Sequence, residues 1–111
     1  MTDPLLAQTA ELIKAPFELE RAPDPADEAE LLALLSDRIE EMLQRRPEYL
    51  MSLLYRLDVL EEKIIPAMHP AAPEPAHIGL ARLVLERQKQ RAFTKLNIKP
   101  GKLEGLEGWE L

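Results

Sequence analysis

The chain has 111 residues, a formal net charge of −6 and no cysteine. This length fits one domain with one core, and the lack of cysteine excludes disulfides, thiolate zinc ligands and a thiol nucleophile. An acidic balance argues against a general nucleic-acid binder, which is usually net basic. The sequence opens without a basic and apolar leader, and no apolar run approaches the roughly 20 residues that span a bilayer. We therefore expect a soluble, unprocessed cytoplasmic protein without a membrane partner.

The charges are unevenly distributed along the chain. Residues 1–45 carry a net charge of −7, whereas residues 78–102 carry +6. Two interpretations of the basic segment stay open. Either it meets an acidic partner or a phosphate, or it pairs with the acidic helix of its own chain.

An aspartate followed by a proline predicts the start of two helices in the N-terminal half. Asp3-Pro4 begins a short helix that ends at Ala15-Pro16, because the residue before a proline is pushed out of the α region. After an irregular acidic connector over residues 17–23, Asp24-Pro25 begins a second helix, which Pro47 ends. The apolar face of this second helix is formed by Leu31, Leu32, Leu35, Ile39, Met42 and Leu43.

The most apolar predicted helix covers residues 48–57, where Glu48, Ser52 and Arg56 form the only polar stripe. A helix of this kind must be covered on most sides, so we expect it at the centre of the fold. The apolar residues that place it there are Tyr49, Leu50, Met51, Leu53, Leu54, Tyr55 and Leu57.

The end of this helix depends on Asp58. Asp58 and Glu61 have the spacing of a capping box, which predicts a break near Leu57 and a new helix over residues 59–68. A continuous helix over residues 48–65 is the alternative, since Pro66 can kink a helix or terminate it.

The last long helix is predicted from Pro75 to about Leu96, after a proline-rich loop. Its core positions approximate a 3-4 repeat over Ile78, Ala81, Leu85, Gln88, Ala92 and Leu96. Together these segments predict an all-α fold. It is a compact bundle of four to five helices in one domain, residues 1–102, with an extended C-terminal tail, residues 103–111.

The tail contains the unit Leu-Glu-Gly twice and places an apolar residue at every third position. This period and the two glycines favour an extended strip over a helix. We expect Leu103, Leu106 and Trp109 to dock into an apolar groove near the central helix, on the same domain or on a second copy. The alternative is a disordered end.

Candidate catalytic and metal-binding groups are few. Glu74 and His77 have the Glu-x-x-His spacing of carboxylate-bridged metal sites, but those sites need two such motifs. Ser36 and Ser52 lie inside predicted helices, and none of the four glycines belongs to a phosphate-binding loop. We expect no enzyme activity, no cofactor and no metal.

The basic residues of the last helix are a further candidate site. Arg87, Arg91 and Lys95 are spaced by four residues and therefore share one side of the helix. That side either contacts a nucleic-acid backbone or is solvated and paired with acids.

A structural ion pair is predicted between two helices. Arg56 is an isolated base on the polar stripe of residues 48–57, and Glu86 is the one acid in residues 78–102. We predict that Arg56 and Glu86 pair across the helices. The alternative is that Glu86 pairs with Arg82 or Lys89 on its own helix.

Two short blocks carry a family resemblance, Tyr55-Arg56-Leu57-Asp58-Val59 and the later Leu83-Val84-Leu85-Glu86-Arg87-Gln88-Lys89-Gln90. They resemble small bacterial helical proteins that have a YRLDV block and a later LxLERxxQ block and no known activity. The resemblance implies a bacterial cytosolic protein in which Tyr55, Arg56, Asp58 and Glu86 form one structural unit.

The sequence as a whole favours a non-catalytic protein-interaction module that self-associates as a homodimer. The reason is that its apolar helix faces exceed what a domain this small covers alone. In that dimer, Glu30, Asp37 and Glu41 of one chain face the basic stripe of the other. The alternative is a nucleic-acid-associated regulator that uses Arg87, Arg91 and Lys95.

Overall fold

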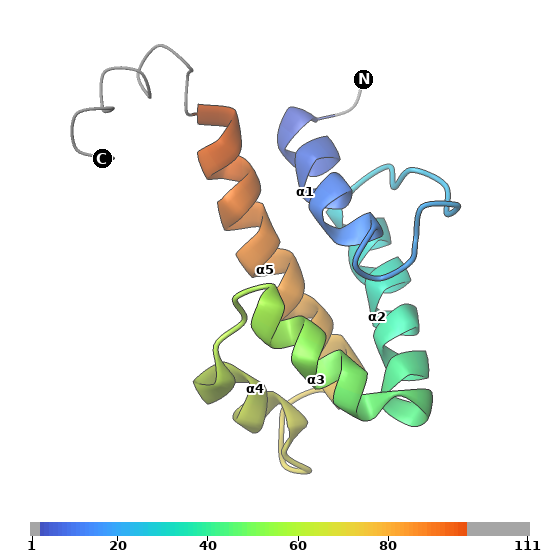
Figure 1. Ribbon diagram of the computed structural model, residues 1–111, viewed down its shortest axis with the longest axis vertical. Helices are drawn as coiled ribbons and strands as arrows, with labels where there is room; N and C mark the ends of the chain where they lie inside the picture. The colour runs from blue at the N-terminus through green and yellow to red at the C-terminus, as the bar shows by residue number, and fades with distance from the viewer. Residues whose placement is uncertain (1–2, 98–111) are drawn as a thin grey trace, which may run out of the picture.

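The computed structural model describes residues 3–97, which form five α-helices and no strand within that range (Figure 1). They are α1 (Pro4–Lys14), α2 (Glu28–Arg45), α3 (Pro47–Arg56), α4 (Glu61–Met68) and α5 (Ala76–Asn97). The predicted all-α bundle is confirmed. Leu103, Leu106 and Trp109 lie outside the described residues, so their docking stays a prediction.

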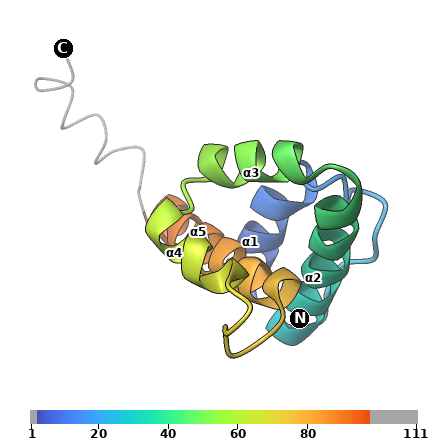
Figure 2. The ribbon, with the colours of Figure 1, turned by 90° about the horizontal axis from the view of Figure 1, so that it is seen from below.

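The helix around which the others are arranged is α5. It packs against α1, α2 and α4, whereas α3 packs against α2 and lies along one side of the bundle (Figure 2). The prediction that residues 48–57 form the centre is therefore wrong. The physical reason is length. The 22 residues of α5 extend over about 33 Å, which is enough to contact three other helices.

The core is one cluster to which all five helices contribute. Leu50, Leu53 and Leu54 of α3 are buried in it as predicted, but Tyr49 and Tyr55 are 38% and 49% exposed. Helix α3 is therefore covered on one side only. At the other end of the chain α5 buries no side chain beyond Ala92, so Leu96, predicted at a core position, is exposed.

Aspartates cap the first two helices. The Asp3 carboxylate accepts a hydrogen bond from the Leu5 amide at 3.1 Å, as predicted for the start of α1. The cap of α2 is Asp27, whose carboxylate accepts from the Glu30 amide at 2.9 Å. The predicted start of α2 at Asp24-Pro25 is therefore three residues early, and Asp24 instead pairs with Lys14.

The connection after α1 contains a core residue. Glu18 adopts a left-handed backbone conformation with φ of 60°. The Glu18 amide donates to the Ala15 carbonyl at 3.2 Å and the Leu19 amide to the Lys14 carbonyl at 2.7 Å, the two bonds of a Schellman motif. This turn buries Phe17 completely, although the sequence predicts an irregular connector there.

Glu18 also joins this turn to α2 through charge. Its carboxylate accepts hydrogen bonds from Arg38 and Arg46, and Arg38 Nε donates to the Phe17 carbonyl at 2.9 Å. The hydrogen bond and the positive charge of Arg46, with a smaller contribution from Arg38, lower the pKa of Glu18 below its ordinary value of 4.5. The network orients the turn that buries Phe17.

Asp58 separates α3 from α4. Its φ is 65°, and the amides of Asp58 and Val59 donate to the carbonyls of Tyr55 and Leu54, both at 3.0 Å. These bonds form a second Schellman motif, which ends α3. The predicted break is confirmed, but the capping box is wrong, because Leu60 precedes α4 and caps it without a side-chain hydrogen bond.

The left-handed turn at Asp58 predicts an unusual order of stability between two variants. Asp58→Gly and Asp58→Ala both remove the carboxylate, but only glycine adopts positive φ without steric cost. We expect the glycine variant to be more stable by about 1 kcal/mol in urea denaturation. If residues 48–65 formed a continuous helix, the alanine variant would instead be the more stable one by about 1 kcal/mol. That order of stability would contradict the turn.

Candidate functional site

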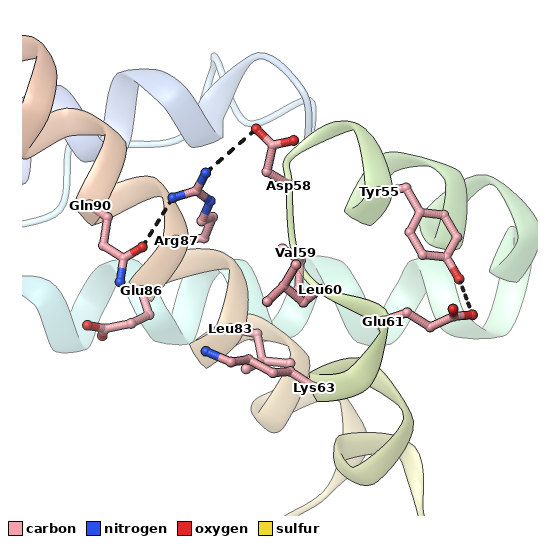
Figure 3. Close-up of a pocket in the computed structure, with 10 residues that line it drawn as sticks. All are labelled: Tyr55, Asp58, Val59, Leu60, Glu61, Lys63, Leu83, Glu86, Arg87 and Gln90. Atoms are coloured by element: carbon pink, nitrogen blue, oxygen red, sulfur yellow. Dashed lines mark hydrogen bonds and ion pairs between the residues drawn. The ribbon is translucent and has the colours of Figure 1, made fainter.

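A groove of about 740 Å³ lies between the α3–α4 turn and α5 (Figure 3). Its apolar surface comes from Val59 and Leu60 in the turn and from Leu83 on α5. Val59 is buried and Leu83 half-buried, whereas Leu60 is 53% exposed. The groove therefore offers an accessible leucine beside a packed apolar floor.

Three contacts hold polar groups around this groove. Arg87 Nη2 lies 3.9 Å from Asp58 Oδ2, and Arg87 Nη1 donates to Gln90 Oε1 at 3.2 Å. The Tyr55 hydroxyl donates to Glu61 Oε2 at 3.0 Å, and this hydrogen bond raises the pKa of Tyr55 above its ordinary value of 10.0. These five residues therefore already have partners within the chain.

Gln88 fixes the two walls of the groove relative to each other. Its side chain is fully buried, and Nε2 donates to the Leu57 carbonyl at 2.9 Å while Oε1 accepts from Arg91 Nη1 at 3.0 Å. The apolar repeat in the sequence predicts Gln88 at a core position, but it does not identify the groups to which Gln88 is hydrogen-bonded. Its amide ties the end of α3 to the middle of α5.

No ion pair joins Arg56 and Glu86 within residues 3–97, and both side chains are exposed. The Arg56 guanidinium lies over the Tyr49 ring, 5.8 Å from its centroid. Arg56 lies seven positions after Tyr49, which is about two helical turns, so both side chains occupy one face of α3. Across the groove it is Asp58 that faces α5, where it meets Arg87.

Several basic residues of α5 have partners within the chain. Lys89 Nζ lies 3.1 Å from Glu28 of α2, which agrees with the interpretation that the basic segment pairs with the chain's own acidic helix. Arg82 pairs with Glu74 at 2.9 Å. Of the predicted stripe, Arg87 faces Asp58 and Arg91 binds Gln88, while Lys95 is exposed.

The two histidines have different neighbours and do not share a site. His69 Nδ1 accepts from the Ala71 amide at 2.9 Å, and His77 lies 4.0 Å from Glu40. Within the described part of the chain, no three histidine, aspartate or glutamate side chains form a group that could hold a metal ion. None of the helices in that part combines the length and the apolar character needed to cross a membrane.

Both sequence blocks that carry the family resemblance contribute to the groove. Tyr55, Asp58 and Glu86 line it together, whereas Arg56 is not among its lining residues. No family model, curated protein or solved structure matches the chain.

Proposed function

We propose that this chain is a non-catalytic protein-interaction module that self-associates as a homodimer. The observation that carries the proposal is a set of large apolar side chains exposed on α3, α4, α5 and the α3–α4 turn. Leu60, Ile65 and Phe93 are 53%, 63% and 59% exposed. Of these three, Leu60 lines the groove, and exposed apolar surface beside a hollow is typical of interaction sites.

The lining of the groove supports binding rather than chemistry. Its residues include no histidine, serine or threonine. Asp58 and Arg87 of the lining form an ion pair, and the Glu61 carboxylate accepts a hydrogen bond from Tyr55. Among these lining residues no serine, threonine or cysteine nucleophile stands beside a base that would activate it.

Sedimentation velocity of the full chain at micromolar concentration tests the proposal. We expect a species with the mass of two chains. A chain that ends after Lys102 lacks Leu103, Leu106 and Trp109, and weaker dimers of this chain would assign the tail a part in the contact. A single chain mass at all concentrations would refute self-association.

A nucleic-acid-associated regulator is the second candidate, because Lys95 is exposed and carries no ion pair within residues 3–97. The engagement of Arg87 by Asp58 makes this candidate the weaker one. A salt-dependent gel shift with RNA or DNA, lost on charge reversal of Arg87, Arg91 and Lys95, would favour it over the interaction module.

A further inference from the structure

The groove presents one unpaired charge of each sign. Lys63 of α4 and Glu86 of α5 both line it, and both are exposed. Neither forms an ion pair or a side-chain hydrogen bond with any residue of the described range 3–97. In Figure 3 the Lys63 side chain extends from α4 past Leu83 to the side where Glu86 projects from α5.

An apolar surface adjoins these two charges. Leu60, with half of its side chain exposed, and Leu83 lie beside them in the same groove. In a dimer with two-fold symmetry, both subunits use the same patch. Every contact from one residue to a second residue of the partner therefore occurs twice, once in each direction. A patch with one base, one acid and an apolar part is complementary to itself under this rotation.

We propose that this groove face binds a second copy of the chain in a two-fold contact. In that contact Leu60 packs near the two-fold axis, and Lys63 faces the partner subunit's Glu86 twice, once in each direction. The inference rests on the proposed self-association and names the surface that carries it. The apolar contact supplies affinity, and the charge pairs set the register and exclude other partners.

The charge pattern favours a second copy over the chain's own tail as the occupant. Residues 103–111 contain three acids and no base. In the groove these carboxylates would meet Asp58, Glu61 and Glu86, the three acids that line it. A second copy brings a base to Glu86 and an acid to Lys63, so it matches both unpaired charges.

Charge reversal in two separate chains tests the contact. In a Lys63→Glu homodimer, a glutamate at position 63 would face the partner's Glu86 in both contacts. In a Glu86→Lys homodimer, Lys63 would face a lysine at position 86 in both contacts. We expect each variant alone to raise the dimer dissociation constant at least about tenfold. An equimolar mixture restores both opposite-charge contacts, so dimers should return as heterodimers, detected by native mass spectrometry with one chain isotopically labelled.

The variants have matched controls, the first of them on α2, which lies across the bundle from α4 (Figure 2). Arg45→Glu reverses an exposed charge there, Glu11→Lys reverses an exposed charge on α1, and dimerisation of both variants should stay as in the wild type. Recovery on mixing also excludes misfolding as the cause of dissociation. Lys63→Glu places a carboxylate in the first turn of α4, where it suits the helix dipole.

The outcomes separate this inference from the proposed function. A wild-type dimer that both single variants retain would overturn the groove face and leave self-association standing. If such a dimer is lost on truncation after Lys102, the tail is the occupant instead. A mixture that stays monomeric would overturn the paired contact, and a wild-type monomer would overturn both proposals.

Discussion

Replacement of Phe17 by alanine should lower the free energy of unfolding by about 3–5 kcal/mol. Phe17 is fully buried and belongs to the single hydrophobic core, although it lies after the end of α1. Removal of its ring takes away apolar burial and leaves a cavity that the helices fill only in part. Urea denaturation followed by circular dichroism measures the loss.

Phe93→Ala is the matched control, because it makes the same chemical change at an exposed position of α5. We expect its free energy of unfolding to change by no more than about 0.5 kcal/mol. Equal losses at both positions would contradict the burial of Phe17 in the turn that follows α1.

Gln88→Ala should lower the free energy of unfolding by about 2–4 kcal/mol. The substitution removes a fully buried side chain and deprives the Leu57 carbonyl of its donor at 2.9 Å. Gln88→Met keeps most of the volume and loses the hydrogen bonds alone, so we expect a smaller loss of about 1–2 kcal/mol.

The exposed Gln90 provides the control for this pair, since Gln90→Ala removes the same side chain two positions further along α5. We expect Gln90→Ala to change the free energy of unfolding by no more than about 0.5 kcal/mol. If Gln88→Met were as stable as the wild type, the hydrogen bond to Leu57 would contribute nothing to the joint between α3 and α5.

Helix positions follow from the sequence because their signals are local. Asp3 before Pro4 and the break at Asp58 depend on residues within one turn of the helix end, and the structure places both as predicted. The start of α2 was misplaced because Asp24 and Asp27 offer two caps. Local chemistry does not decide between them.

The arrangement of the helices could not be predicted in the same way. Periodicity indicates which residues of a helix are apolar, but not which neighbours cover them. Tyr49 and Tyr55 gave α3 an apolar surface on most sides, and yet both rings lie at the surface of the bundle. Glu18 has no sequence signal for positive φ, since glycine is the usual residue in that conformation.

The groove was visible in the sequence only in part. Tyr55, Asp58 and Glu86 come from the two sequence blocks that carry the family resemblance, and those blocks line opposite sides of one hollow. Lys63 belongs to neither block. Its significance arises only when α4 lies beside α5 and leaves its charge without a partner.

On our proposal, two copies of this chain meet at the groove face. Amide resonances of a ¹⁵N-labelled chain, recorded from low to high micromolar concentration, test it residue by residue. We expect concentration-dependent shifts that cluster at Leu60, Lys63, Leu83 and Glu86, with the resonance of the exposed Arg45 on α2 unchanged. Spectra that do not change with concentration, or shifts confined to other surfaces, would contradict it.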